Sequence, residues 1–219
     1  MTLVSIRSSA KQNLSKACGH LVTYYSLTVI CPTSRIWWSM KRRYSDMYFV
    51  RQRLYQMYKN ALRLRQTRSV ERIIAMLAPI FETKFPPKRY CLDTKAIIQE
   101  RLVGLKEFVA QLVQLRRACL EPFEITLQSF FETEQISEIF RLVGHALAVP
   151  ARTKSPCAPS ICNDSEPCAI CLEDQSSSKD YTFELPCGHH FHQNCILEWF
   201  DTQHTCPMCR MEASSGRVV

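Results

Sequence analysis

The chain has 219 residues, 12 cysteines and a formal net charge of +8, so it can hold one or two domains, each with its own core. Its longest uninterrupted apolar run is Ile73–Phe81, far short of the roughly 20 residues that a membrane-spanning helix needs. The first residues also lack the pattern of a secretory signal. Together these features exclude an integral membrane protein and predict a soluble or peripheral one.

The positive charge is concentrated in one segment. Residues 35–72 carry eleven Lys/Arg and two acidic residues, whereas the rest of the chain is near neutral. Such a patch commonly binds phosphate, on a lipid or on a nucleic acid. Aromatic residues lie between the cations, as in some nucleic-acid-binding proteins, but here they fit a buried helix face and no nucleic-acid motif accompanies them. A nucleic-acid partner is therefore the less favoured alternative.

The first secondary-structure elements are predicted from composition. Residues 20–31 are rich in Val, Thr, Tyr and Ile and predict a strand, residues 32–34 predict a turn, and residues 35–44 predict the returning strand. Ser45 is a suitable N-cap for a helix that we expect to run to about residue 64. A strand that precedes this hairpin is hard to place.

The next elements are predicted from proline and from apolar spacing. Residues 85–88 read Phe-Pro-Pro-Lys and must be extended, because proline restricts its own backbone and that of its predecessor. Apolar residues that step by three and four predict a helix from Thr94 to about Ala118. A second amphipathic stretch covers residues 122–147, and Ile73–Phe81 is ambiguous. Residues 150–167 are rich in proline and serine and predict a flexible linker.

Eight metal-ligand residues lie in the last quarter of the chain: Cys168, Cys171, Cys187, His189, His192, Cys195, Cys206 and Cys209. Each Cys-x-x-Cys presents two thiolates that can bind one tetrahedral zinc, and eight ligands make two such sites. Closed four-coordinate sites are structural, so we expect two structural zinc ions in a reducing compartment rather than a disulfide framework. His190 breaks both histidine spacings and is predicted not to be a ligand.

This segment, residues 168–210, resembles a RING finger of the two-histidine type. The resemblance implies an interleaved arrangement of the ligands. The first zinc would be held by Cys168, Cys171, His192 and Cys195, and the second by Cys187, His189, Cys206 and Cys209. RING fingers of this type are ubiquitin-protein ligases that bind a ubiquitin-conjugating enzyme carrying ubiquitin. By this resemblance, contacts to that enzyme come from Ile170, Trp199 and Pro207.

Arg210 follows the last ligand and matches the family's linchpin position. A cation there would donate hydrogen bonds to both ubiquitin and the conjugating enzyme. No cysteine of the chain is a credible transfer nucleophile, because metal occupies the ligand thiolates. The resemblance therefore implies a positional mechanism without a covalent intermediate on this chain.

Three motifs follow one another in the first half of the chain: Arg42-Arg43-Tyr44 at a strand end, Phe85-Pro86-Pro87-Lys88, and Arg101 on the long helix. Their order gives a resemblance to a PX (phox-homology) domain, over about residues 15–133. It implies a phosphoinositide site in which Arg43 binds the 3-phosphate, Tyr44 stacks beneath the inositol ring, Lys88 binds the 1-phosphate and Arg101 binds the 4- and 5-hydroxyls. Tyr90 and Leu92 would enter the bilayer interface. Met47 departs from the family's usual Phe.

The sequence thus predicts an α+β chain with a PX-like domain of sheet and helices at residues 15–133. An accessory helix at 134–149, a flexible linker at 150–167 and a cross-brace RING finger at 168–210 follow. We expect a cytoplasmic ubiquitin-protein ligase, peripheral on endosomal membranes that bear phosphatidylinositol 3-phosphate. A non-catalytic zinc-stabilised adaptor in endosomal trafficking is the main alternative. The sequence specifies no protein substrate.

Overall fold

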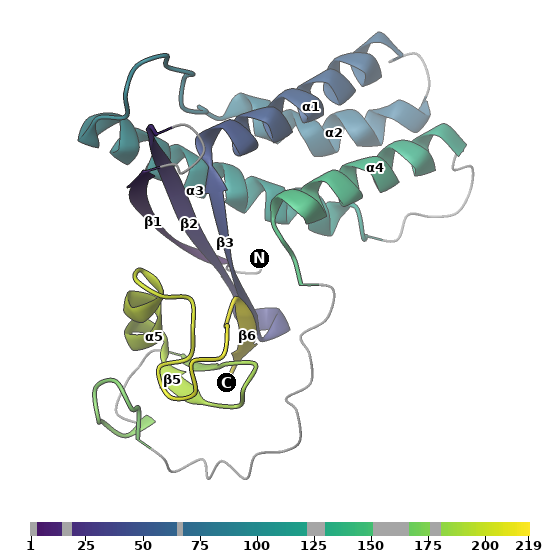
Figure 1. Ribbon diagram of the computed structural model, residues 1–219. Helices are drawn as coiled ribbons and strands as arrows, with labels where there is room; N and C mark the ends of the chain where they lie inside the picture. Colours follow the sequence, from purple (N-terminus) through teal and green to yellow (C-terminus); the bar gives the residue numbers. More distant parts are fainter. Residues whose placement is uncertain (1–3, 15–18, 65–67, 122–129, 151–166, 176–180) are drawn as a thin grey trace. The chain divides into compact units, whose positions relative to one another are not determined.

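The computed structural model describes residues 4–14, 19–64, 68–121, 130–150, 167–175 and 181–219 (Figure 1). Its strands are β1 (Ser5–Leu14), β2 (Leu21–Cys31), β3 (Ile36–Arg43), β4 (Thr182–Glu184), β5 (His190–His192) and β6 (Ser215–Val218). Its helices are α1 (Tyr44–Arg63), α2 (Arg68–Glu82), α3 (Lys95–Ala118), α4 (Phe130–Ala146) and α5 (Gln193–Phe200). This is the mixed α and β content that the sequence predicts.

The hairpin of β2 and β3 confirms the two strands predicted between residues 20 and 44. A single turn of 3-10 helix, Pro32–Ser34, joins them, and Arg35 follows it in the left-handed region with φ 50°. Strand β1, which the sequence did not place, is the neighbour of β2 in the sheet. Its side chains are of mixed exposure, with Ile6 buried and Leu14 exposed, so no clear alternation marks it in the sequence.

The start of α1 corrects one prediction, because Ser45 lies inside the helix and is not its N-cap. Arg43 holds the N-cap position, and the Asp46 carboxylate accepts the Arg43 backbone N–H at 3.0 Å. Aspartate three residues after the cap satisfies an open N–H and places a negative charge at the positive end of the helix dipole. The carboxylate of Asp46, rather than the Ser45 hydroxyl, therefore fixes where α1 begins.

The apolar run that the sequence left ambiguous is helical, and it forms most of α2. Ile73, Leu77 and Ile80 are buried at a spacing of four and three, which is one face of a helix. Pro79 lies inside the last turn, where it removes only one backbone donor. No helix in the described ranges has the length and apolar character that crossing a bilayer demands.

Helix α3 confirms the prediction closely, since it begins after Thr94 and ends at Ala118. The Thr94 hydroxyl accepts the Ile97 backbone N–H at 3.4 Å and caps the helix. Gly104 lies in the middle of α3, where the ring of Pro86 packs so closely that a Cβ would collide with it. The extended proline segment therefore packs directly on α3. Helix α4 is shorter than the stretch predicted, and residues 122–129 lie outside the described ranges.

The chain divides into two compact units, each discontinuous in sequence. One unit consists of Met1–Ser9, Ser26–Met40 and Pro150–Val219, and the other of Ala10–Tyr25 and Lys41–Val149. Within the second unit, helices α1 to α4 contact one another and bury a shared core. The domain boundaries drawn from the sequence stay a prediction, and most of the expected linker lies outside the described residues.

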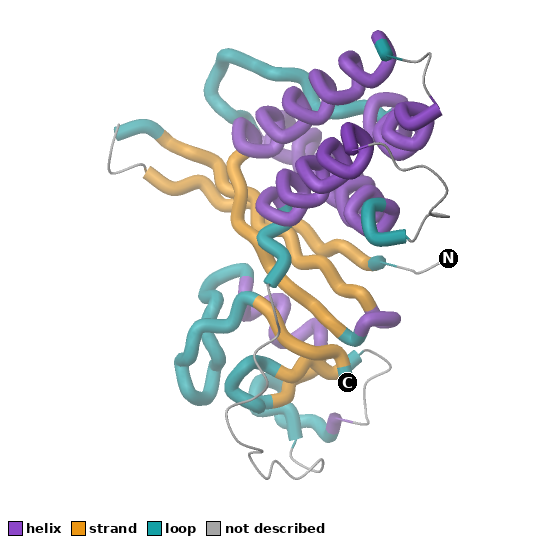
Figure 2. The backbone as a smooth tube through the Cα atoms, turned by 90° about the vertical axis from the view of Figure 1, so that its right-hand side faces the viewer, coloured by secondary structure: helices purple, strands orange, loops and turns teal. Residues whose placement is uncertain are grey.

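The strands follow the order β1-β2-β3-β6-β4-β5, drawn in orange in Figure 2. Strand β6 is antiparallel to β3 on one side, with Trp37 opposite Gly216. On its other side β6 is antiparallel to β4, with Phe183 opposite Val218. The sequence did not predict β6 or its pairing, because the strand is short and lacks a hydrophobic alternation of its own.

Candidate functional site

The eight predicted metal ligands lie in two groups of four. The first group is Cys168, Cys171, His192 and Cys195, and the second is Cys187, His189, Cys206 and Cys209. In each group the ligand atoms all lie within 4.8 Å of one another. The groups interleave along the sequence, because His192 and Cys195 complete the site that Cys168 and Cys171 begin. His190 is in neither group.

The two Cys-x-x-Cys turns have the same backbone construction. Leu172 follows the first turn with φ 65°, and its N–H donates to the Cys168 carbonyl at 2.7 Å. Arg210 follows the second with φ 60°, and its N–H donates to the Cys206 carbonyl at 2.9 Å. Each turn therefore points two thiols to one side, where a tetrahedral cation can bind both.

Both ligand histidines turn Nδ1 toward the sulfurs. The Nδ1 atom of His192 lies 3.2 Å from Cys171 Sγ, and that of His189 lies 3.2 Å from Cys187 Sγ. The other ring nitrogen of His192, Nε2, lies 3.1 Å from the Asp174 carbonyl oxygen. Zinc-binding histidines typically donate their second N–H to such an oxygen, which fixes the tautomer that leaves Nδ1 free to bind metal.

The ionisation of the thiols also fits a bound cation. Burial, together with the nearby thiols of Cys209 and Cys206, raises the pKa of Cys187 to about 12. Burial also opposes ionisation of Cys168, but backbone hydrogen bonds from Cys171 and His192 lower its pKa to about 7. Crowded thiolates need a positive ion between them, and three sulfurs with one nitrogen is a common donor set for structural zinc. The residues present fit two structural zinc ions.

The four residues predicted to meet a conjugating enzyme lie on the two turns and on α5. Ile170 lies in the first turn with 37% of its surface exposed, and Pro207 is half-buried in the second. Trp199 is half-buried near the end of α5, and its Nε1 donates to the Thr205 carbonyl at 2.8 Å. Arg210 is exposed. All four are accessible to a partner.

Two exposed apolar residues beside these were missed by the sequence reasoning. Leu172 is 78% exposed and Met208 is 52% exposed. Aligning the two Cys-x-x-Cys turns would have found them, because Met208 corresponds to Ile170 and Leu172 to Arg210. They add two exposed apolar side chains to the turns that carry Ile170 and Pro207.

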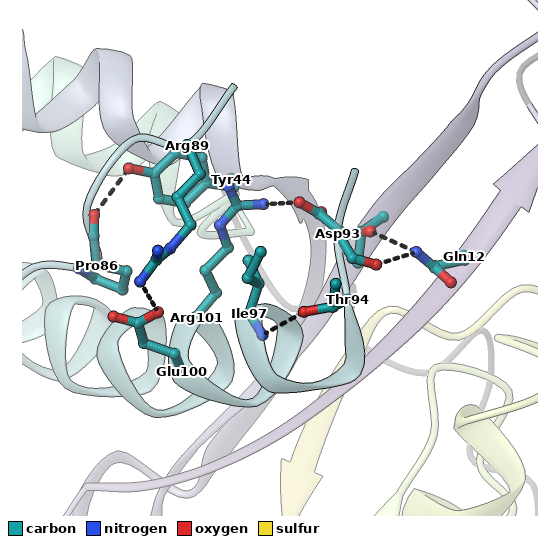
Figure 3. Close-up of polar contacts among 10 residues, drawn as sticks. Gln12, Tyr44, Pro86, Arg89, Asp93, Thr94, Ile97, Glu100 and Arg101 are labelled. Atoms are coloured by element: carbon teal, nitrogen blue, oxygen red, sulfur yellow. Dashed lines mark hydrogen bonds and ion pairs between the residues drawn. The ribbon is translucent and has the colours of Figure 1, made fainter. Parts of the chain in front are cut away.

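In the other unit, three of the four predicted lipid-binding residues gather around one aromatic cluster. The guanidinium of Arg101 lies 4.0 Å from the centroid of the Tyr44 ring. The Tyr44 hydroxyl donates to the Pro86 carbonyl at 2.8 Å, as Figure 3 shows, and burial raises its pKa to about 12. Lys88 Nζ lies 5.6 Å from the ring centroid of Tyr48, which neighbours Tyr44. Lys88 itself is exposed.

Arg101 has an acidic partner that the sequence reasoning missed. Its side chain is only 6% exposed and forms an ion pair of 2.6 Å with Asp93, seen in Figure 3. Gln12 donates to the Asp93 carbonyl at 3.2 Å and holds the segment from the other side. The Nε of Arg101 is buried, and the buried Tyr25 hydroxyl lies beside the same guanidinium; burial raises the pKa of Tyr25, and the neighbouring Arg101 partly offsets this rise. The sequence offered one signal for this ion pair, because Asp93 directly precedes Thr94, the N-cap of α3, the helix that carries Arg101.

Arg43, the fourth predicted lipid ligand, ends β3 and is the N-cap of α1. It is exposed and pairs with Asp46 at 3.1 Å, a hydrogen bond that raises the pKa of the Arg43 guanidinium. Its neighbour Arg42 instead donates to the carbonyls of Ala146 and His145, at 3.0 and 2.8 Å, and so caps α4. The two residues expected to enter a bilayer, Tyr90 and Leu92, are 89% and 76% exposed.

The comparisons with known proteins concern the zinc segment. Residues 166–210 match the family model described as the ring finger domain. The amyloplastic E3 ubiquitin-protein ligase SGR9 of Arabidopsis thaliana is 47% identical over 51 residues, which are 23% of this chain and 18% of that protein. The RING-H2 finger protein ATL28 of the same plant is 41% identical over 56 residues, 26% and 22% of the two chains. The E3 ubiquitin-protein ligase TRAIP of Xenopus laevis is 39% identical over 54 residues, 24% and 11%.

These matches confirm the prediction of a two-histidine RING finger with two structural zinc sites. The chain spans less than a quarter of the length of the curated relatives described, so the likeness is that of one segment. No solved structure matches the chain. The PX-like assignment of the first half stays a prediction.

Proposed function

We propose that the chain is a RING-type ubiquitin-protein ligase. The observation that supports this most strongly is the pair of interleaved Cys/His groups in a segment that matches the ring finger domain. Ligases among its relatives, such as SGR9 and TRAIP, add support. The exposed apolar residues on the zinc turns, with the half-buried Trp199 of α5, are the residue types that a conjugating enzyme's apolar loops would bind.

The ligase acts by holding a charged conjugating enzyme in a reactive pose. When bound, zinc supplies no chemistry but fixes the two turns and α5. Ile170, Trp199 and Pro207 bind the enzyme. A substrate amine attacks the carbonyl carbon of the ubiquitin thioester, and the enzyme's cysteine thiolate leaves. Restricting the motion of the thioester before this attack is a proximity effect that lowers the barrier.

Arg210 limits that motion most directly. Its left-handed backbone at the end of the second zinc turn leaves the guanidinium exposed. Five N–H donors in a rigid fork can bond carbonyl oxygens of ubiquitin and of the conjugating enzyme at once. We therefore expect Arg210→Ala to slow ubiquitin transfer more than it weakens binding of the enzyme.

The test is single-turnover discharge of ubiquitin from a charged conjugating enzyme to free lysine, with the full chain loaded with zinc. Wild type should accelerate discharge, and Ile170→Ala should reduce the acceleration by about tenfold or more. Tyr181→Ala, which removes an exposed aromatic side chain elsewhere in the segment, is the matched control. If wild type binds the enzyme but discharges nothing, the chain is the zinc-stabilised adaptor instead.

We also propose that a phosphoinositide, phosphatidylinositol 3-phosphate by the PX resemblance, recruits the chain to the cytoplasmic face of endosomes. Support comes from Tyr44 and Arg101 in contact, with Lys88 near the same aromatic cluster. The exposed Tyr90 and Leu92 are suited to the bilayer interface.

Two carboxylates bear on this second proposal. Asp46 forms an ion pair with Arg43, and Asp93 forms one with Arg101. A headgroup therefore has to compete with both carboxylates for the two guanidinium groups. The Arg43 pair is exposed and contributes little, so a phosphate of double charge can displace it. The buried Arg101 pair is expected to persist, so a headgroup would meet an arginine that already bonds Asp93.

Lipid binding is tested by sedimentation with phosphatidylcholine vesicles that contain phosphatidylinositol 3-phosphate. Arg43→Ala should lower the bound fraction by about tenfold, as expected when one charge-assisted phosphate contact is lost. Arg53→Ala is the control, because Arg53 is an exposed cation of α1 engaged with Glu138. Equal loss in both variants would mean a diffuse charge effect and would remove the headgroup site.

A further inference from the structure

We infer that Trp37 is a positioning residue for helix α5, and that the functional ligase unit includes the β2–β3 hairpin and β6 as well as the zinc segment. The consequence for catalysis rests on the proposed ligase function. The side-chain contacts of Trp37 lie within one compact unit, which includes Ser26–Met40 and Pro150–Val219.

Trp37 reaches across β6 to the zinc segment. It lies opposite Gly216 in the β3–β6 register, and Glu184 of β4 lies on the far side of β6. A Cβ on Gly216 would lie 2.7 Å from the indole Nε1 and would collide with the Glu184 carbonyl oxygen. The missing side chain therefore leaves the space through which the indole passes.

The far end of the indole contacts the core of the zinc segment. Its ring is nearly parallel to that of Phe183, with an interplanar angle of 9° and centroids 4.9 Å apart. Its Nε1 donates to the Glu184 carbonyl at 3.4 Å. Trp37 is fully buried, and an aromatic side chain of this size buries about 150–250 Å². It belongs to the same core as Phe183, although nearly 150 residues separate the two in sequence.

The same indole supports the end of α5. Its ring centroid lies 5.5 Å from that of Phe200, the last residue of the helix. His204 stacks on Phe200 at 5.6 Å. Phe200 directly follows Trp199, which we assign to the conjugating-enzyme surface. The orientation of this helix end, and with it that of Trp199, depends on contacts from β3.

A second contact from the N-terminal strands reaches the next residue. Arg7 of β1 lies 3.6 Å from the carboxylate of Asp201, which caps the C-terminal end of α5. The core that surrounds α5 also contains Ile30 from β2, and Ala213 and Val218 from beyond residue 210. In residues 166–210 alone, Phe183 and Phe200 would lose the indole of Trp37 that packs against them. We conclude that elements outside the zinc segment set the pose of the docking helix.

The test uses the full chain loaded with zinc. Trp37→Leu removes the aromatic contact, and Trp37→Phe restores an aromatic ring. Gly216→Ala adds a methyl group that collides with both the indole and the Glu184 backbone carbonyl, so it disturbs the seat of Trp37 and the β4–β6 pairing together. Gly144→Ala is the matched control, because its added methyl meets only the flexible end of Arg116. The readouts are zinc content, hydrogen exchange of the amides of residues 196–201, and the dependence of thioester discharge on the concentration of charged enzyme.

For Trp37→Leu and Gly216→Ala we expect two zinc ions per chain and exchange about tenfold faster in residues 196–201. The KM for the charged enzyme should rise about tenfold with kcat nearly unchanged, because a displaced Trp199 weakens docking. Trp37→Phe should recover most of both effects, and Gly144→Ala should match wild type. Agreement of the exchange and KM data supports the inference.

Two results would overturn it. Unchanged exchange and KM in Trp37→Leu would mean that α5 does not depend on Trp37. Loss of zinc from Trp37→Leu would mean that Trp37 holds the whole segment together and does not specifically position α5. A wild-type chain that discharges no thioester would instead refute the proposed ligase function, and the exchange data would still decide whether Trp37 positions the helix.

Discussion

The zinc segment, residues 166–210, and the cationic region of the other unit, which holds Arg43, Lys88 and Arg101, differ in how firmly their sequences determine their contacts. In the zinc segment, eight ligands predicted by spacing lie in two groups of four. In the cationic region, two of the predicted phosphate or inositol ligands are paired with carboxylates, Arg43 with Asp46 and Arg101 with Asp93. Ligand spacing leaves few alternatives for a thiolate, whereas an arginine bonds whichever acceptor the fold brings near.

Removing one zinc ligand should produce the largest effect and sharpen this contrast. Cys171→Ser should leave no more than one zinc per chain and abolish thioester discharge, by about 100-fold or more, since structural zinc sites supply on the order of 10 kcal/mol of folding free energy. Metal analysis and the discharge assay measure the two effects. Cys91→Ser, at an exposed cysteine outside both groups, is the control and should change neither.

In the cationic region the largest expected effect comes from Asp93→Ala. This change leaves Arg101 buried without its partner, and we expect the free energy of unfolding to fall by about 3 kcal/mol. Urea denaturation measures the loss. The double variant Arg101→Met, Asp93→Ala should recover much of it, because no unpaired charge is then buried. A double variant as unstable as the single one would contradict this explanation.

The same contrast explains how much of the fold the sequence predicts. The hairpin of β2 and β3 and the helix α3 follow from composition, apolar spacing and the Thr94 cap, all of which are local signals. The start of α1 was missed, because the Asp46 carboxylate accepts the Arg43 backbone N–H and Arg43, not Ser45, takes the N-cap position. The pairing of β6 with β3 was missed for a different reason. It depends on the fit between Trp37 and Gly216, which no local pattern records.

The candidate sites divide in the same way. The zinc ligands and the positions of Ile170 and Pro207 can be read from the Cys-x-x-Cys motifs. The ion pair of Arg101 and the capping role of Arg42 cannot, because both partners are fixed by tertiary packing. A basic run in a sequence predicts charge, and the fold decides which of its members remain available to a ligand.

A smaller effect is expected at the Tyr44 hydroxyl. Tyr44→Phe keeps the ring beneath Arg101 and removes only the hydrogen bond to the Pro86 carbonyl. We expect a loss of about 1 kcal/mol in the free energy of unfolding, as is typical for one buried hydrogen bond. Lipid sedimentation should stay unchanged. A strong loss of lipid binding would show that the hydroxyl itself contacts the headgroup.

The smallest effect is expected at an exposed pair near the same site. Arg89 and Glu100 lie 3.0 Å apart, with side chains 43% and 42% exposed, as drawn in Figure 3. Glu100→Gln should change the free energy of unfolding by less than about 0.5 kcal/mol, because exposed ion pairs contribute little. Urea denaturation beside Asp93→Ala gives the comparison directly. A loss near that of Asp93→Ala would mean that burial does not determine how much each of the two ion pairs contributes to the free energy of unfolding.

The firmest claim concerns the metal, and native mass spectrometry of the purified full chain tests it most directly. Two zinc ions should be present per molecule, and a chelator should remove them together with the near-ultraviolet circular dichroism of Trp199 and its neighbours. Folded protein with no stoichiometric zinc, or a spectrum unaffected by chelation, would contradict the assignment of both ligand groups.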